Sequence, residues 1–139
     1  MKISVVMPNY KGERFLEETI RSIISQRAEG VDLEFIVVDG ASKDRSQEII
    51  RKYGSEISHI ISEPDKGPPD AINKGLKLAT GEILCWLNSD DCYYPGALKR
   101  VVEAMSAHPG EALCFGHCPI VNEAGDEIRA GITRFKEFF

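Results

Sequence analysis

The sequence lacks any apolar run long enough to cross a membrane, and it lacks an excess of positive charge. The apolar run at the N-terminus, residues 2–7, is ended by Pro8 and Asn9 before a signal-peptide core or a membrane span is complete. The 17 Lys and Arg face 22 Asp and Glu, and the net charge of -5 repels a polyphosphate backbone. We therefore expect no transmembrane segment, no nucleic-acid partner and a cytoplasmic location.

Cysteine motifs and phosphate loops are also missing. Cys85 and Cys114 lie within apolar stretches, as free buried thiols do in a reducing cytoplasm. Cys114 and Cys118 are four residues apart on a predicted strand, about 13 Å, which is too far to share one zinc ion. No GxGxxG turn follows the first predicted strand. This absence argues against an NAD-type Rossmann domain and against a Walker phosphate loop.

The pattern that is present favours an α/β domain. Short β-branched runs alternate with segments whose apolar residues recur three and four apart, which is typical of a parallel sheet covered by helices. A hairpin around residues 123–126 is expected to add an antiparallel edge to that sheet. We expect one domain, 1–139, with βα units in 1–111 and a hairpin and incomplete C-terminal segment in 112–139. The predicted strands are 2–7, 33–39, 57–62 and 83–87, and the predicted helices lie around 15–24, 49–53, 72–79 and 98–105.

Polar residues follow each of the four predicted strands. Ligands bind beyond the carboxyl ends of the strands in open parallel sheets, so these loops are expected to converge on one binding edge. One polar loop is weak evidence, because loops are polar on any protein surface. Four loops that meet at one edge are stronger evidence. They comprise residues 8–12, 39–44, 63–70 and 88–91.

The adjacent acids Asp90 and Asp91 follow the apolar run 83–87, where we expect that they cannot both reach bulk solvent. Two like charges about 4 Å apart repel by roughly 4 kcal/mol at an effective dielectric of 20, so one would stay protonated without a partner. A divalent cation removes that cost, and oxygen ligands favour Mg²⁺ or Mn²⁺. The alternative is that one of these acids caps the helix that follows Pro95.

Three further positions carry candidate base-binding chemistry. Asp39 ends the second predicted strand, where its carboxylate can accept a hydrogen bond from a base imide or a ribose hydroxyl. After the first strand, Tyr10 can pack against a base and Asn9 can hydrogen-bond it. Trp86, by contrast, is expected in the core rather than as a platform for a sugar.

Gly75 interrupts the third predicted helix and weakens it by about 1 kcal/mol relative to Ala. A close approach of this helix to the sheet or to a ligand would explain the missing side chain. Asp70, Asn73 and Lys74 would then lie near the binding cleft. The alternative is that the lysines of this helix are simply solvated.

These loops and strands together resemble the family-two glycosyltransferases, whose nucleotide-binding half has the GT-A fold. The resemblance runs over residues 3–121, and its motifs match in order. The matching segments are SVVMPNY at 4–10, VVDGASKD at 37–44, EPDKG at 63–67 with DAINKG at 70–75, and LNSDD at 87–91.

The resemblance implies an α/β, Rossmann-like sandwich with a mostly parallel central sheet, truncated after the donor-binding half. It implies metal-dependent, inverting transfer of a sugar from a nucleoside-diphosphate sugar to a saccharide or lipid-linked acceptor in polysaccharide biosynthesis for the cell envelope. UDP is expected because it is common in the family. Asp39 would bind the nucleobase or ribose, Asp90 would ligate the metal, and Asp91 would assist or bind a sugar hydroxyl. Asn88 replaces the first Asp of DxD, and its amide can bind ribose or a metal-bound water.

The pattern and the resemblance together define a predicted site. Lys66 or Lys74 would stabilise the departing diphosphate together with Mg²⁺ or Mn²⁺. Asp90 and Asp91 are the predicted metal ligands. The predicted donor-binding residues are Pro8, Asn9, Tyr10, Asp39, Lys66, Asp70, Asn73, Asn88 and Ser89.

The catalytic base is not identified. Members of the family carry an Asp or Glu base well after the DxD region, within about 3 Å of the acceptor hydroxyl. Two hypotheses therefore stay open: an enzyme whose donor site this chain holds, or a binding module without turnover, either a fragment or a subunit that awaits an acceptor domain. The downstream acids, none in a recognisable base motif, are Glu123, Asp126, Glu127 and Glu137.

The C-terminal segment carries three aromatics, Phe135, Phe138 and Phe139. Termini are normally polar, so we expect these side chains to be covered. Either the segment docks on this domain as an amphipathic helix, or a partner domain or second subunit of a homo-oligomer covers it. A peripheral position at the inner face of the membrane is compatible with the expected cytoplasmic location.

Overall fold

The computed structural model describes residues 1–128, and the chain divides into two compact units, Met1–Pro109 and Gly110–Phe139. Within residues 1–128, no helix is long and apolar enough to cross a membrane. The C-terminal aromatics Phe135, Phe138 and Phe139, together with Glu137, lie outside the described residues. The predictions for that segment therefore stay predictions.

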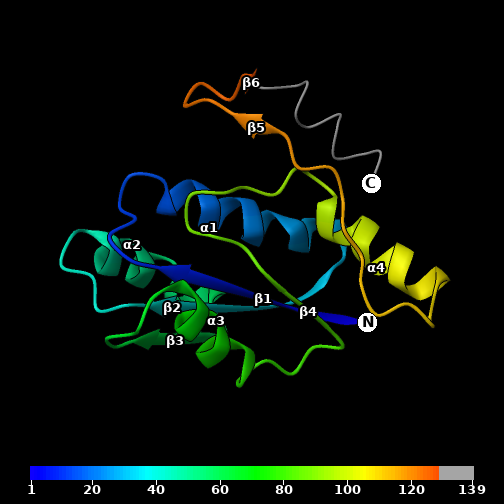
Figure 1. The fold of residues 1–139 in the computed structure, drawn as a ribbon, viewed down its shortest axis with the longest axis horizontal. Coiled ribbons are helices and arrows are strands. Elements are labelled where there is room, and N and C mark those ends of the chain that lie inside the picture. Colours follow the sequence, from blue (N-terminus) through cyan, green and yellow to red (C-terminus); the bar gives the residue numbers. More distant parts are fainter. Residues whose placement is uncertain (129–139) are drawn as a thin grey trace. The chain divides into compact units, whose positions relative to one another are not determined.

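The first unit contains a four-stranded parallel sheet in the order β3-β2-β1-β4 (Figure 1). The two central strands are buried along nearly their whole length, as the continuous apolar runs of the sequence predict. Asn9, Asp39 and Ser62 are paired partners on β1, β2 and β3, so three strands end level with one another. The strands are β1 Lys2–Asn9, β2 Asp32–Asp39, β3 His59–Ser62 and β4 Ile83–Trp86.

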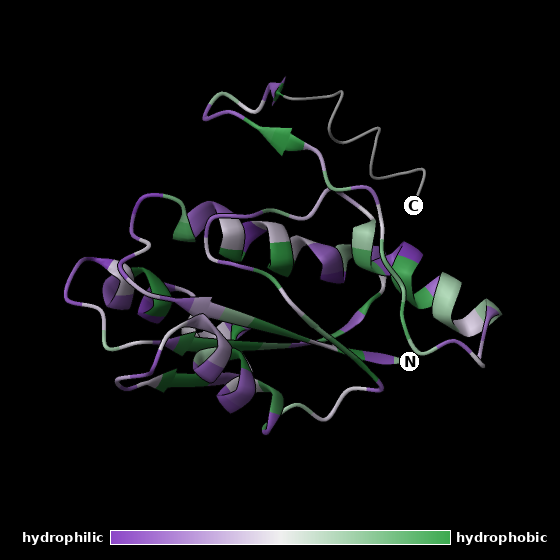
Figure 2. Cartoon of the chain, viewed as in Figure 1, coloured by the Kyte–Doolittle hydropathy of each residue, from purple (hydrophilic) through white to green (hydrophobic). Residues whose placement is uncertain are grey.

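Helices cover both faces of this sheet, which makes a three-layer α/β arrangement. Helices α1, α2 and α4 pack against one face and bury Leu16, Ile20, Ile23, Ile49, Ile50 and Leu98. Helix α3 packs against the other face, over Val6, Ile36 and Val38. Figure 2 shows the corresponding pattern, with apolar strands and helices that are apolar on one side only. The helices are α1 Leu16–Ile24, α2 Ser46–Lys52, α3 Pro68–Leu76 and α4 Ala97–Ala107, with short 3₁₀ turns at Ser25–Glu29 and Gly54–Glu56.

The close approach predicted at Gly75 is confirmed. A Cβ atom built on Gly75 would lie 2.4 Å from Val6 Cγ1 and 3.2 Å from Val38 Cγ2. Only a residue without a side chain lets α3 lie this close to β1 and β2. The loop before α3 is thereby drawn against the carboxyl edge of the sheet.

The predicted hairpin forms, but it does not extend the central sheet. Strands β5 Ile120–Val121 and β6 Glu127–Ile128 pair antiparallel in a separate two-stranded sheet. Asn122 Oδ1 closes the turn by accepting hydrogen bonds from the Ala124 and Asp126 amides. Two paired residues on each strand bury little, and all four are exposed. The expectation of an added antiparallel edge is therefore wrong for the described residues.

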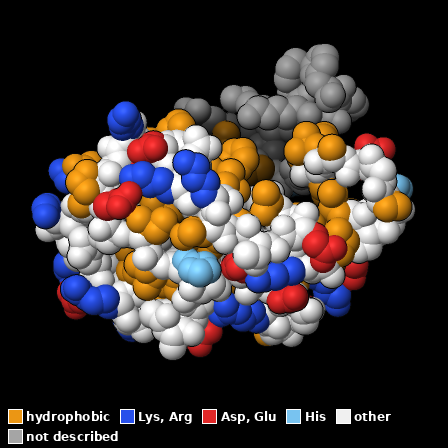
Figure 3. All heavy atoms as spheres, turned by 90° about the horizontal axis from the view of Figure 1, so that it is seen from below, with side chains coloured by type: hydrophobic (Ala, Val, Ile, Leu, Met, Phe, Trp, Pro, Cys, Tyr) orange, Lys and Arg blue, Asp and Glu red, His pale blue; other side chains and the backbone are white. Residues whose placement is uncertain are grey.

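The prediction that Trp86 lies in the core is also wrong. On β4, Ile83 and Cys85 face the α1 side of the sheet, so Leu84 and Trp86 face the α3 side. Helix α3 packs on β1 and β2. Trp86 is consequently 58% exposed and Leu84 is 53% exposed. Figure 3 shows one face of the molecule on which apolar side chains are visible between mixed acidic and basic ones.

Candidate functional site

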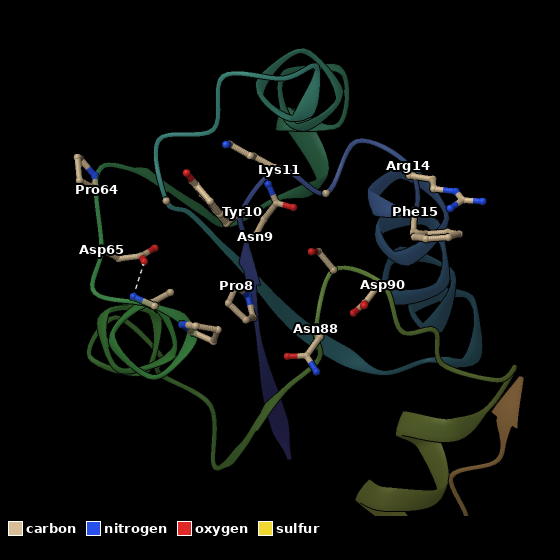
Figure 4. A pocket seen from close by; sticks show the side chains of 16 residues that line it. Pro8, Asn9, Tyr10, Lys11, Arg14, Phe15, Pro64, Asp65, Asn88 and Asp90 are labelled. Carbon is tan, nitrogen blue, oxygen red and sulfur yellow. Dashed lines mark hydrogen bonds between the residues drawn. The ribbon is translucent and has the colours of Figure 1, made fainter. Parts of the chain in front are cut away.

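A cleft of about 980 Å³ lies beyond the carboxyl ends of the strands. Loops that follow β1, β2, β3 and β4 all contribute to it, as expected for an open parallel sheet. In Figure 4, Asp65 and Asp90 lie on opposite sides of the cleft, with Tyr10 and Asn9 between them. The lining residues are Pro8, Asn9, Tyr10, Lys11, Gly12, Arg14, Phe15, Gly40, Pro64, Asp65, Gly67, Pro68, Ala71, Asn88, Ser89 and Asp90.

The cleft contains many, but not all, of the residues predicted from the sequence. Six predicted residues line it: Pro8, Asn9, Tyr10, Asn88, Ser89 and Asp90. Five predicted residues do not contribute to its walls: Asp39, Lys66, Asp70, Asn73 and Asp91. The walls also include Lys11, Gly40 and Asp65, which are not among the residues predicted from the sequence. These three lie inside the predicted strand-end loops, so position after a strand is the signal that could have identified them.

Asp39 lies beneath the cleft rather than in its wall. Its side chain is fully buried, and its carboxylate accepts hydrogen bonds from Asn9 Nδ2 at 2.8 Å and from Ser42 Oγ at 2.6 Å. The Ser42 amide at 3.0 Å and Ser62 Oγ at 3.2 Å complete the set. The carboxylate therefore binds the ends of three strands together. These donors distribute its charge over a preorganised polar network.

This network also sets the orientation of Asn9. Because the Asn9 amide donates to a carboxylate, its Nδ2 must face Asp39 and its Oδ1 must face away. Asn9 Oδ1 is buried without a hydrogen-bond partner among the described residues. A buried acceptor left unpaired costs roughly 1–3 kcal/mol. The site thus holds an unsatisfied acceptor at the floor of the cleft.

Two glycines let the loops around the cleft touch. A Cβ atom on Gly12 would lie 2.2 Å from Asn9 Oδ1 and 2.9 Å from Ser89 Oγ. A Cβ atom on Gly40 would lie 2.7 Å from Asp65 Oδ2. The absence of these side chains therefore brings the loops after β1 and β4 together at Gly12, and the loops after β2 and β3 together at Gly40.

Lys74 does not line the cleft, and its ammonium binds neighbouring groups of the protein instead. Its Nζ lies 2.8 Å from Glu63 and 3.6 Å from Asp70, and it donates to the Pro64 carbonyl at 3.0 Å. The hydrogen bond with Glu63 raises the pKa of Lys74. A hydrogen bond from the Lys66 amide, together with the nearby Lys74 charge, lowers the pKa of Asp70. Lys74 and Asp70 hold the loop before α3 in place.

The acid pair differs from expectation in its exposure. Asp90 and Asp91 are both exposed, so the premise that they cannot both reach solvent is wrong. The helix-cap alternative also fails, because α4 begins after Gly96, with φ of 74° and no side-chain cap. Asp91 Oδ2 instead accepts a hydrogen bond from Asn88 Nδ2 at 3.2 Å, and Asp90 lines the cleft. Neither acid has a helix-capping role in α4.

The described residues contain no group of three or more His, Cys, Asp or Glu that could hold a metal ion. A cation beside Asp90 would therefore take most of its ligands from diphosphate oxygens and water. Mg²⁺ commonly binds in this way, through one or two carboxylates and substrate phosphates. The residues fit a metal that arrives with a diphosphate better than one held permanently by the protein.

Comparison with known proteins gives a consistent family assignment. The family model described as "Glycosyl transferase family 2" matches residues 4–137. The chain is 34% identical over 126 residues to GalNAc(5)-diNAcBac-PP-undecaprenol beta-1,3-glucosyltransferase of Campylobacter jejuni, with 88% of this chain and 40% of that protein covered. It is 30% identical over 116 residues to the poly(ribitol-phosphate) beta-N-acetylglucosaminyltransferase TarS of Staphylococcus aureus, with 81% of this chain and 20% of that protein covered.

Solved structures show the same fold. TarS 1-349 in complex with UDP matches with a TM-score of 0.71 and 25% identity, over 87% of this chain and 42% of that chain. The mannosyltransferase PcManGT of Pyrobaculum calidifontis, in complex with GDP-Man and Mn²⁺, matches with a TM-score of 0.68 and 26% identity, over 76% and 32%. The chain spans from a fifth to two fifths of the length of the curated relatives.

Proposed function

The chain belongs to glycosyl transferase family 2, and on that premise we propose that it holds the donor site of an enzyme that transfers a sugar from a nucleoside-diphosphate sugar to an acceptor. The observation that carries the proposal is the meeting of four strand-end loops in one cleft. In that cleft, the exposed ring of Tyr10 lies apart from the acidic loop that carries Asp90 (Figure 4). The ring can stack with a base, and the acidic loop can hold the divalent cation that a diphosphate binds.

The nucleoside end of the donor is assigned to the side of Tyr10. The Tyr10 ring is 63% exposed and offers a stacking surface for a base. Asp65 Oδ1 accepts a hydrogen bond from the Gly67 amide at 2.8 Å. A Cβ atom built on Gly40 would lie 2.7 Å from Asp65 Oδ2 and 3.2 Å from Tyr10 Cδ2, so this carboxylate oxygen lies near the ring. A carboxylate there accepts hydrogen bonds from base imide or ribose hydroxyl groups. Asp39 contributes by holding Asn9 and Ser42 in position beneath this region.

The diphosphate end is assigned to Asn88, Ser89 and Asp90. Asp90 would hold Mg²⁺ or Mn²⁺ on the diphosphate, and Asp91 would support it through Asn88. A bound metal neutralises the charge that develops on the leaving diphosphate. The Mn²⁺ and GDP-Man in the related mannosyltransferase structure support a metal at such a site.

The nucleotide we propose is UDP, and the reaction we propose is inverting. The complex of TarS with UDP supports the choice of nucleotide. In an inverting transfer the acceptor hydroxyl loses its proton to a carboxylate base and attacks the anomeric carbon opposite the diphosphate. Residues 1–109 supply the donor site, and the base stays unassigned. Of the downstream acids, Glu123, Asp126 and Glu127 belong to the second unit.

The acceptor class we propose is a saccharide or lipid-linked saccharide used in the cell envelope. The names of two relatives support it, one acting on poly(ribitol phosphate) and one on an undecaprenol-linked saccharide. A lipid-linked acceptor would place the reaction at the inner face of the membrane, with the chain in the cytoplasm. A second candidate function is nucleotide-sugar binding without turnover, which the unassigned base favours.

Calorimetric titration of the 139-residue chain with UDP-sugars and GDP-sugars, with Mn²⁺ or with EDTA, tests the donor site. We expect binding that needs Mn²⁺, that Asp90→Asn weakens at least tenfold, and that Asp32→Asn leaves unchanged. Asp32 is a matched control because it is exposed at the opposite, amino end of β2. If none of the tested donors binds in a metal-dependent way, the proposed donor site is refuted. Release of free sugar or transfer to an acceptor then separates an enzyme from a binding module.

A further inference from the structure

Two residues at the binding edge have a backbone conformation that side chains normally avoid. Lys11 has φ of 53° and Ala41 has φ of 58°, and they are the non-glycine residues with positive φ in the described part of the chain. They lie in the loops that follow β1 and β2. Strain of this kind persists only where the surroundings hold it, and it is concentrated at ligand sites. The strained backbone at Lys11 therefore suggests that this turn has a role in ligand binding.

The surroundings of Lys11 hold it firmly. The Lys11 amide donates to Ser42 Oγ at 2.8 Å, and the same hydroxyl donates to Asp39 Oδ1 at 2.6 Å. Ser42 is 3% exposed, so this hydroxyl is part of the buried network below the cleft. On the other side, Gly12 admits no side chain because Asn9 Oδ1 lies in the way. The turn is thus fixed before any ligand arrives.

This turn brings the Lys11 side chain back over its neighbour. Lys11 Nζ lies 5.1 Å from the centroid of the Tyr10 ring, within the range of a cation–π contact. Figure 4 shows the two side chains next to each other at the cleft. Tyr10 is 63% exposed, and a Cβ atom built on Gly40 would lie 3.2 Å from its Cδ2. The ammonium therefore lies over one face of a largely exposed ring.

We propose that Lys11 is a positioning residue for the nucleobase of the donor. Its ammonium fixes the Tyr10 ring as a platform with one open face, on which the base stacks. The proposal rests on the function proposed above and assigns this role to a residue that was not among the site residues predicted from the sequence. Ordering the ring in advance strengthens binding, because an exposed side chain otherwise loses its freedom when the ligand binds.

The test compares a nucleoside with its diphosphate, using uridine and UDP, or guanosine and GDP if the wild type prefers them. Lys11→Met removes the charge and keeps the length of the side chain. We expect it to weaken both ligands by the same factor, roughly two- to tenfold. Lys11→Arg keeps the cation and should restore both affinities. NMR titration measures the nucleoside, and calorimetry measures the diphosphate.

Glycine variants separate the ammonium from the backbone strain. Lys11→Gly relieves the strain and removes the ammonium, so we expect a higher Tm together with weaker binding of both ligands. Ala41→Gly is the matched control, because it relieves the same kind of strain without removing a functional group. It should raise Tm, which measures the effect of relieving strain alone. A merely structural role for Lys11 would instead make stability and affinity change in the same direction.

Several results would overturn the inference. If Lys11→Met weakens the diphosphate and spares the nucleoside, Lys11 contacts phosphate rather than positioning the ring. If Lys11→Met changes neither affinity, or if Lys11→Arg fails to restore them, the ammonium has no role in base stacking. Failure of the wild type to bind any nucleotide would refute the proposed function itself. Wild-type binding with no effect of Lys11→Met refutes this inference alone.

Discussion

The substitution Glu34→Gln should destabilise the protein by about 3 kcal/mol at pH 7. Glu34 lies at the amino end of the sheet, and its side chain is 6% exposed. Its carboxylate accepts hydrogen bonds from Ser4 Oγ at 2.5 Å, the Thr80 amide at 2.7 Å, Thr80 Oγ1 at 2.8 Å and Lys2 Nζ at 3.0 Å. These contacts hold the connection between α3 and β4 against β1 and β2. Gln offers one oxygen where the carboxylate offers two.

The magnitude follows from the pKa of Glu34. Burial alone would raise that pKa, but the hydrogen bonds from Ser4, Thr80 and Lys2 outweigh burial and lower it from 4.5 to about 2. A difference of about 2.5 pH units corresponds to roughly 3 kcal/mol. Because the folded pKa is depressed, this stability is fully present above pH 4.5 and disappears as the pH falls through 2. At pH 3 roughly 1 kcal/mol should remain.

Urea unfolding of wild type and Glu34→Gln at pH 7 and pH 3 measures both values. The difference in unfolding free energy should shrink by more than half at the lower pH. Comparing the two proteins isolates Glu34, because other carboxylates, including Glu17 with a pKa of about 2, titrate in both. Glu48→Gln is the control, since Glu48 is 68% exposed and its ion pair with Arg45 should contribute less than about 1 kcal/mol. A cost below about 1 kcal/mol at pH 7, or one independent of pH, would refute the reasoning.

Three further results are expected. Gly12→Ala should weaken nucleotide binding at least tenfold in calorimetry, because its Cβ would lie 2.2 Å from Asn9 Oδ1 and force the cleft loops apart; unchanged affinity would contradict this. Gly75→Ala should cost about 1–3 kcal/mol in urea unfolding, because its Cβ would lie 2.4 Å from Val6 Cγ1. The single tryptophan, Trp86, is 58% exposed, so its fluorescence maximum should shift little when the chain unfolds. A large red shift on unfolding would instead indicate a buried ring.

Much of the fold could be predicted because its signals are local. The buried strands β1 and β2 appear as continuous apolar runs, and the helices appear as apolar residues three and four apart. Pro8, Asn9, Tyr10, Asn88, Ser89 and Asp90 could be selected because the end of a parallel strand is a property of the sequence pattern. The predicted close packing at Gly75 followed from the cost of glycine in a helix. Each of these inferences needs only the backbone path.

Other features depend on which elements meet in space. Trp86 lies in an apolar strand, and its exposure follows from the packing of α3 on β1 and β2. Lys74 resembles a phosphate-binding residue in sequence, but Glu63 and the Pro64 carbonyl bind its ammonium. The exposure of Asp90 depends in the same way on how its loop leaves the sheet.

The sequence by itself determined the alternation of strands and helices, the family motifs and the loops that carry the polar residues. Periodicity and turn chemistry are short-range, so they can be read without a structure. The tertiary structure alone decided that Asp39 supports Asn9 from below, that Asp65 enters the cleft and that Lys11 covers Tyr10. These outcomes depend on side-chain directions and strand register, through which residues some 30 positions apart become neighbours. No local pattern encodes that juxtaposition.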